Sequence, residues 1–375
     1  MNDITAISIV SFIIVLLFIL LSIFLLSVKT TKKLSNQLLA SFLIITAIDI
    51  SVFFYNTFIS FPPAIEMLRI QISNFKDPLL FLYILSIIYS DFKLKWIHLV
   101  HTIPWLICII ILSPNFFLAS KEIQSVFLSN YSDTNEAKII DIFSKIIEVI
   151  YIIAELYYII RYRKLLLENF TGKEAFDNYR WVKQLITFIL IGQLLTFIKG
   201  YLRDYSTFDI DVINAFRIIL LAFGLFFSFW LVFKALISPK LFRGINVKLQ
   251  LSKELLSKSD ASISKNKQID ILKSFMKTEE PFLEPSLTVK SLSEKINIPH
   301  RDLSILINQE LGQHFFDFIN TYRIEKAKTI LKDPSKKKHT VLEILYAVGF
   351  NSKSSFNTAF KKHTGKTPTA FRKAS

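Results

Sequence analysis

The sequence predicts an all-α protein in two parts, a bundle of seven transmembrane helices over residues 1–238 and a domain with two helix-turn-helix units over residues 282–375. Three observations predict this class. The 375 residues are 52% hydrophobic with a mean hydropathy of +0.43, which is high for a soluble protein. Long apolar runs fill the first two thirds of the chain. Apolar residues at helical spacing, separated by turn residues, fill the last quarter.

Seven apolar runs each approach the roughly 20 residues that a helix needs to cross a bilayer. The first run carries no charge and exceeds the roughly 7–15 residues of a signal-peptide core, so it is expected to remain as a span. The third is the weakest, because Lys76, Asp77 and Pro78 interrupt it. The expected spans are 4–28, 35–59, 66–89, 96–113, 139–160, 181–201 and 212–236.

The basic residues predict the orientation of these spans, because Lys and Arg collect in short cytoplasmic loops. They are concentrated after the odd-numbered spans, whereas the loop after the fourth span is more acidic. This pattern predicts a multi-pass protein of the inner cell membrane with its N-terminus outside and its C-terminus in the cytoplasm. The basic residues that follow odd-numbered spans are Lys29, Lys32, Lys33, Lys93, Lys95, Arg161, Arg163, Lys164, Lys173, Arg180, Lys234, Lys240, Arg243 and Lys248.

Three acidic residues inside the expected spans are candidates for a polar site of a sensor domain. Charged residues within a membrane usually face the bundle interior or water. Glu148 and Glu155 are seven residues apart and share one helix face, and Asp49 lies in the second span. They could line a ligand pocket or a cation site. The alternative is that they pair with Lys145 or with another helix.

Residues 239–281 are expected to form a cytoplasmic linker that is partly helical. Residues 241–257 can form a short amphipathic helix, which would lie on the membrane surface or pair with its copy in a homodimer. The polar stretch 257–267 is expected to be flexible, and residues 266–276 to form a lead-in helix.

The first helix-turn-helix unit is predicted from residue 287 onward. One helix face precedes a turn at Asn297–Pro299, a second helix runs to Glu310, and Gly312 follows it as a cap. A connecting helix of about 18 residues then continues until Pro334 stops it. The apolar positions of the two short helices are Val289, Leu292, Ile296, Leu303, Leu306 and Ile307.

The second unit, residues 340–373, repeats the first. Leu292 and Ile344 are 52 residues apart, and Gly312 and Gly365 are 53 apart, so one extra residue in the second turn accounts for the difference. Two such units on one connecting helix would place their second helices on one side, roughly 34 Å apart. From Phe282 onward, 16 Lys and Arg stand against 8 Asp and Glu, which suits a polyanionic partner.

The last ninety or so residues resemble the DNA-binding domain of the AraC/XylS family of transcription regulators. The residues that carry the resemblance are Leu303-Ser304, Asn320-x-x-Arg323-Ile324-x-x-Ala327, Gly349-Phe350-x-Ser352-x-Ser354-x-Phe356, Phe360-Lys361-Lys362, Gly365 and Thr367-Pro368. Ser293 and Leu345 depart from it, since the family usually has Ala where the helices of each unit meet. The resemblance implies a partner in double-stranded DNA, read by the second helix of each unit in adjacent major-groove segments.

Carried over position by position, the resemblance gives two sets of base-facing residues. Arg301 and Lys353 are expected to carry most of the specificity, because bidentate contacts of Arg or Lys to guanine are the strongest readout. The base-facing sets are Arg301, Ser304, Ile305 and Asn308, then Lys353, Ser354, Ser355, Asn357 and Thr358. Residues expected near phosphates are Lys361, Lys362, Lys366 and Arg372.

Three functions compete for the whole chain. The first is a membrane-embedded one-component transcription regulator, anchored in the lipid bilayer and controlled by a small molecule or by another membrane protein. The second is a transporter or channel with a regulatory tail. The third is a membrane enzyme, against which the sequence offers no P-loop, HExxH or nucleophile elbow. His98 and His101 have no further ligand beside them, so the sequence predicts no metal site and no cofactor.

Overall fold

A computed structural model describes residues 6–30, 32–89, 91–171, 176–205, 210–238, 241 and 262–374. Within these ranges every regular element is a helix, apart from one isolated β-bridge, so the expected all-α class is confirmed. The chain divides into two compact units. The first comprises residues 1–159 and 181–248, and the second comprises residues 160–180 and 249–375.

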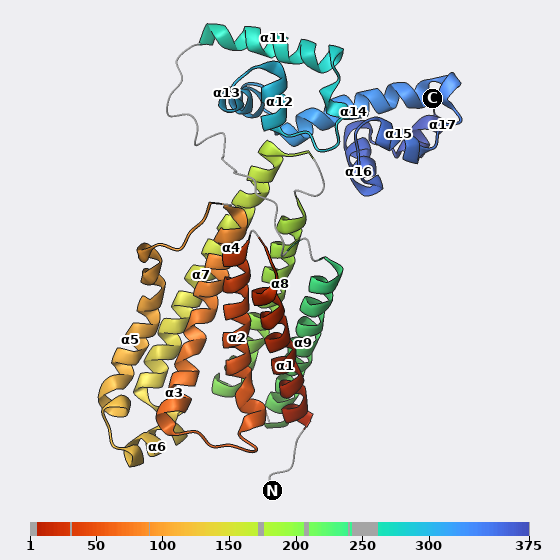
Figure 1. Cartoon of the computed structure of the whole chain (residues 1–375). Coiled ribbons are helices and arrows are strands. Elements are labelled where there is room, and N and C mark those ends of the chain that lie inside the picture. The colour runs from red at the N-terminus through yellow and green to blue at the C-terminus, as the bar shows by residue number, and fades with distance from the viewer. Residues whose placement is uncertain are drawn as a thin grey trace. The chain divides into compact units, whose positions relative to one another are not determined.

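The first unit is a bundle of long apolar helices (Figure 1). Helix α1 (Ala6–Ser27) packs against α2 (Lys33–Tyr55) and α9 (Ile210–Ile237), and α2 packs against α4 (Lys76–Ile88). The remaining helices and turns are α3 (Pro63–Ile72), η1 (Ser73–Phe75), η2 (Trp96–Thr102), α5 (Ile103–Leu112), η3 (Ser113–Phe117), α6 (Lys121–Ser129), η4 (Tyr131–Asp133), α7 (Asn135–Asn169) and α8 (Asp177–Tyr205).

Five helices in the described ranges are long and apolar enough to cross a membrane, judged by length and composition. They lie at the first, second, fourth, sixth and seventh expected spans, and their bounds are Ala6–Ser27, Lys33–Tyr55, Trp96–Phe117, Asp177–Leu202 and Asn214–Ile237. The third expected span is divided into α3, a 3₁₀ turn and α4, and the fifth lies within α7, a 35-residue helix with several charges. The count of seven spans stays a prediction.

In the second unit, α14 (Phe315–Lys332) joins two pairs of short helices. The first pair is α12 (Val289–Ile296) and α13 (His300–Ile305), which continues as the π-helical turn η8 (Leu306–Glu310). The second pair is α15 (Val341–Ala347) and α16 (Lys353–Thr364), followed by α17 (Pro368–Lys373). Each pair has its own core, and each packs on a different half of α14. The 18-residue length expected for the connecting helix is confirmed.

The linker differs in part from expectation. Helix α11 (Ser262–Thr278) includes the expected lead-in helix, and Leu272 and Met276 anchor it in the first core. The expectation that residues 257–267 are flexible is wrong for 262–267, because an anchored helix extends backward through residues that contain no helix breaker. The amphipathic helix expected over 241–257 lies outside the described residues, except for Leu241.

Residues 160–180 belong to the second unit and contact it just before α12 and at the start of α14. Phe170 forms the isolated antiparallel bridge with Thr288, and the Thr171 hydroxyl donates a buried hydrogen bond to the Leu287 carbonyl at 2.7 Å. The Phe176 ring meets the Phe316 ring edge to face, with centroids 5.7 Å apart. Phe170, Thr171 and Phe176 therefore contact the residues just before α12 and the start of α14.

Candidate nucleic-acid interface

In the second helix pair, hydroxyl side chains cap the N-termini of the helices. Thr340 caps α15, because its hydroxyl accepts from the Glu343 N–H at 3.1 Å while the Glu343 carboxylate accepts from the Thr340 N–H at 2.6 Å. The Thr340 N–H and the Thr340 hydroxyl both donate to the Glu343 carboxylate, and these two bonds hold the pKa of Glu343 below its usual value. Ser352 caps α16 through the Ser355 N–H. Leu345, which replaces the usual Ala, is fully buried in the core of this pair.

The first helix pair repeats these devices with different residues. Thr288 and Ser291 form a reciprocal capping box at the start of α12, with both hydrogen bonds at 3.0 Å. Asn297 takes the left-handed conformation, with φ of 53°, at the end of α12. The other departure, Ser293, is buried, and its hydroxyl donates to the Lys290 carbonyl within the same helix. Both pairs thus hold a short helix, a turn and a second helix.

The outer face of α16 presents the residues expected to read DNA. Lys353, Ser354 and Thr358 are exposed, and Ser355 and Asn357 are half-buried. Phe356, Ala359 and Phe360 occupy the inner face. Lys353 is the first residue of α16, where the positive end of the helix dipole opposes a cation by about 0.3–1 kcal/mol, so this lysine does not stabilise the helix start.

Of the four residues of the first pair that are expected to contact bases, two are half-buried and two are buried. Arg301 and Asn308 are half-buried, but Ser304 and Ile305 are 1% and 4% exposed. The expectation that these two side chains point outward is wrong for this structure, because residues 303–307 are buried all around the helix. Asn308 Nδ2 donates to the Ser304 carbonyl at 2.9 Å and to its hydroxyl at 3.2 Å. DNA contact by the four residues stays a prediction.

The residues expected near phosphates lie at and beyond the end of α16. Lys361, Lys362 and Lys366 are exposed, and Arg372 is half-buried on α17. Lys362 Nζ lies 2.6 Å from Asp317 Oδ1 of α14, so an acidic partner already neutralises one of these cations. That pair joins residues 45 apart, and local sequence patterns do not show it.

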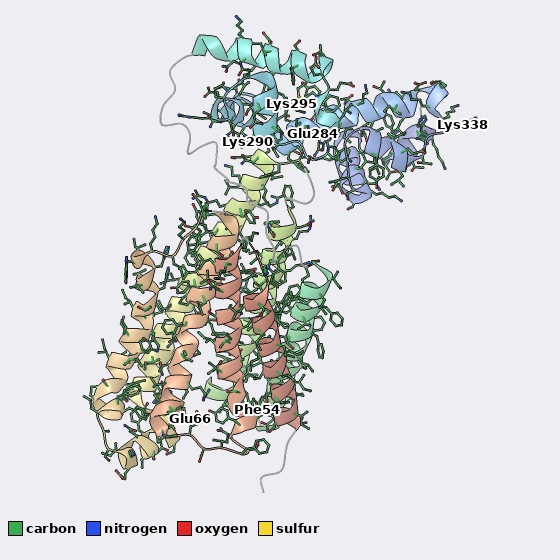
Figure 2. The ribbon with its side chains drawn as sticks, in the orientation of Figure 1. Phe54, Glu66, Glu284, Lys290, Lys295 and Lys338 are labelled. Carbon is green, nitrogen blue, oxygen red and sulfur yellow. The ribbon has the colours of Figure 1, made fainter. Side chains whose placement is uncertain are left out.

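Two further features were not assigned to the site from the sequence. An exposed basic run, Lys336, Lys337 and Lys338, ends two residues before Thr340, the N-cap of α15, and Lys338 is labelled in Figure 2. Three adjacent lysines were the available signal. The second feature is Arg323, which the resemblance included but to which it gave no role. In the structure this side chain is 1% exposed and lies between the two cores.

The three acidic residues expected in the first unit differ in their surroundings, and a shared polar site stays a prediction. Asp49 Oδ2 lies 2.9 Å from Lys76 Nζ, and Asp49 Oδ1 lies 4.0 Å from Arg69 Nη1. Glu155 is 3% exposed, and its Oε1 has no hydrogen-bond partner among the described residues. Glu148 is half-buried on the same helix. Asp49 is therefore paired with basic groups, as the alternative reading held, whereas Glu155 is not paired with Lys145.

The acidic residues Asp49, Glu148 and Glu155 interact with charged groups at the break between α3 and α4. Asp77 interacts with both Glu148 and Glu155, and Lys76 interacts with Glu148. Gln193 Nε2 of α8 donates to Asp77 Oδ1 at 3.4 Å. The sequence signalled Lys76 and Asp77 only as an interruption of the third span. In the described residues no group of three or more His, Cys, Asp or Glu side chains could hold a metal ion.

Comparison with known proteins assigns the C-terminal part of the chain to a class. The helix-turn-helix domain family matches residues 292–374. This part is an AraC-type helix-turn-helix domain of transcription regulators, which implies DNA binding.

Particular relatives match over the same part. The Msm operon regulatory protein of Streptococcus mutans is 30% identical over 88 residues, 24% of this chain and 31% of that protein. An uncharacterized HTH-type transcriptional regulator of Staphylococcus aureus is 36% identical over 86 residues, 23% of this chain and 11% of that protein. The solved C-terminal domain of AraT, a response regulator from Geobacillus stearothermophilus, is 30% identical, with 31% of this chain and 87% of that one covered and a TM-score of 0.24. The chain thus spans less than a third of the length of the Streptococcus mutans and Staphylococcus aureus regulators.

Proposed function

We propose that the protein is a membrane-embedded, non-enzymatic one-component transcription regulator. Its cytoplasmic C-terminal domain binds promoter DNA sequence-specifically, and the helical first unit controls that binding. The observation that carries the proposal is the presence, in one chain, of an AraC-type helix-turn-helix domain and of five helices long and apolar enough to cross a membrane.

The outer surface of the first unit supports membrane embedding. Large apolar side chains are exposed on several of its helices, among them Ile110 at 68%, Ile153 at 62% and Phe233 at 58%. Soluble proteins expose such side chains singly and rarely as extended surfaces. Helices whose backbone groups are bonded internally suit contact with lipid, since the bilayer core offers no hydrogen-bond partners.

The connections between helices support control of DNA binding by the first unit. Residues 160–180 are continuous with α7 and α8. Phe170 and Thr171 contact the two residues just before α12, and Phe176 contacts the start of α14. A signal that favours one arrangement of α7 and α8 would change the geometry of these contacts. The mechanism is a population shift, in which a small molecule or a partner membrane protein binds one arrangement more tightly than the other.

The test is genome-wide DNA occupancy of the intact protein in cells beside an Arg301→Ala/Lys353→Ala variant. Discrete peaks that vanish in the variant support the proposal and identify the promoters. Lys328→Gln serves as a matched charge control, because Lys328 pairs with Glu325 on the connecting helix. Peaks that persist in the double variant would contradict the assignment of the reading residues. Solute flux that survives removal of residues 282–375 would favour a transporter instead.

A further inference from the structure

The two helix pairs meet at a buried joint on α14, and a charged side chain lies at its centre. Arg323 is 1% exposed, between the core of the first pair and the core of the second. Burial lowers the pKa of Arg323 to about 10, which still leaves the guanidinium charged near neutral pH. Burying a cation is costly unless its donors are satisfied, so the contacts of this side chain define its role.

The guanidinium of Arg323 satisfies main-chain acceptors of the segment that precedes α12. Arg323 Nε donates to the Phe282 carbonyl at 2.7 Å, and Arg323 Nη2 donates to the Glu284 carbonyl at 2.7 Å. These carbonyls are 41 and 39 residues away along the chain. A planar guanidinium holds both at once, whereas the ammonium of a lysine is a compact point charge on a flexible stem.

The turn of the second helix pair contacts the same group and the same segment. Arg323 Cζ lies 5.5 Å from the centroid of the Phe350 ring, a cation–π distance. At Gly349, where φ is +88°, an added Cβ would lie 2.5 Å from the Phe282 carbonyl oxygen and 2.8 Å from that of Leu283. The segment 282–284, the connecting helix and the second turn therefore meet around one side chain.

We propose that Arg323 is a positioning residue that fixes the placement of one DNA-reading helix relative to the other. It bonds the start of the first pair and lies over the turn of the second, so it sets the spacing between the two DNA segments that the protein reads. This inference rests on the proposed function, because it assumes that both pairs bind DNA. Arg323 itself touches no DNA in this scheme.

The inference is tested with the full chain in lipid nanodiscs. Three DNA probes are used. The full duplex is the one that the wild-type protein enriches from a random 30-base-pair library. The half duplex keeps only the segment read by the first pair, and the inserted duplex has one extra base pair between the two segments. Arg323→Lys should bind the full duplex at least about tenfold more weakly, because the lysine cannot hold both carbonyls. Its affinity for the half duplex should stay within about twofold of wild type. Its preference for the uninserted duplex should shrink.

A second variant and a control keep the interpretation specific. Phe350→Leu should also lose affinity for the full duplex, and the double variant should lose less than the product of the two single losses, since both changes act on one contact. Lys328→Gln removes a half-buried cation, paired with Glu325, from the same helix and should keep the spacing preference.

Three results would overturn the inference. One is an Arg323→Lys variant with an unchanged spacing preference. Another is equal loss on the full and half duplexes, because Arg323 would then support the fold of the first pair instead of its placement. The third is a double variant, Arg323→Lys with Phe350→Leu, whose loss of affinity equals the product of the two single losses. If the wild-type protein enriches no duplex at all, the proposed function fails first, which separates the two failures.

Discussion

Replacement of Gly349 by alanine tests the close approach between the second turn and the segment before α12. At φ of +88°, an L-residue carries a backbone cost of about 1–2 kcal/mol. The added Cβ would also lie 2.5 Å from the Phe282 carbonyl oxygen and 2.9 Å from the Leu283 carbonyl carbon. Both neighbours are main-chain atoms, so relief requires the backbone to move, at about 1–3 kcal/mol for overpacking. Gly349→Ala should therefore destabilise the second helix pair by about 2–5 kcal/mol.

Gly365 provides a matched control, because it has φ of +73° and its added Cβ would meet nothing within 4 Å. Gly365→Ala should carry only the backbone cost of about 1–2 kcal/mol. Hydrogen exchange of the full-length protein measures both, since main-chain amides of α16 exchange through opening of this pair. Protection should fall by about 5- to 30-fold in Gly365→Ala and by about 30-fold or more in Gly349→Ala. Equal losses in the two variants would refute the close approach.

The Glu343 carboxylate, the basic side chains of the second pair and the Thr171 hydroxyl each give a further prediction. The pKa of Glu343 is lowered by hydrogen bonds from Thr340, so its stabilisation of α15 is complete above the ordinary glutamate pKa and is lost as pH falls through the lowered value. Exchange protection in α15 should fall on acidification in the wild type and not in Glu343→Gln. Lys366→Ala should weaken binding to all duplexes equally and reduce the slope of log affinity against log salt concentration by about 0.9. Lys353→Ala should reduce discrimination against mismatched duplexes by about 1–3 kcal/mol. Titration with DNA at several salt concentrations measures both effects. Thr171→Val removes the buried hydrogen bond to the Leu287 carbonyl, so it should change promoter occupancy in cells, whereas Thr171→Ser keeps the hydroxyl and should not. Unchanged occupancy in Thr171→Val would contradict control of DNA binding through this contact.

The repeat between the helix pairs was predictable because it depends on local rules. Leu292 and Ile344 occupy equivalent buried positions, and Gly312 and Gly365 both adopt left-handed conformations after the second helix of their pair. Apolar spacing, turn residues and caps are properties of neighbouring positions, and periodicity reports them directly. The same rules predicted the length of the connecting helix between the pairs.

Contacts between distant positions were not predictable in this way. The bonds of Arg323 to the segment before α12 and the pair between Lys362 and Asp317 join residues 39 to 45 positions apart, beyond the reach of any helical period. The burial of Ser304 and Ile305 likewise depends on tertiary packing. Spacing showed which helix face they occupy, but it carried no information about what else packs there.

If the first unit lies in a membrane, as proposed, its crossings can be counted directly, and the charges in the third and fifth expected spans bear on that count. Lys76 at the start of α4 is paired with Asp49, and Lys145 of α7 is paired with Asp141 at 2.6 Å, so charges on both helices have partners within the first unit. The Lys76–Asp49 pair is partly buried, which is compatible with a membrane span, whereas the Lys145–Asp141 pair is exposed. Helix α7, with 35 residues, reaches about 50 Å at 1.5 Å per residue, which exceeds the roughly 30 Å hydrocarbon core.

Cysteine labelling with a membrane-impermeant maleimide can therefore count the crossings. The background is Cys108→Ser, which removes the only cysteine of the chain. In right-side-out vesicles, Lys121→Cys should be labelled and Lys93→Cys should be labelled only after permeabilisation, because seven spans with the N-terminus outside put these two positions on opposite sides. The fourth span separates them, so labelling of both before permeabilisation would mean that this segment does not cross. Labelling of Lys93→Cys alone would place the loop after the third span outside, so the third helix would not cross. The C-terminal domain would then be cytoplasmic only if some other crossing were also missing, which a third cysteine between α7 and α8 would reveal.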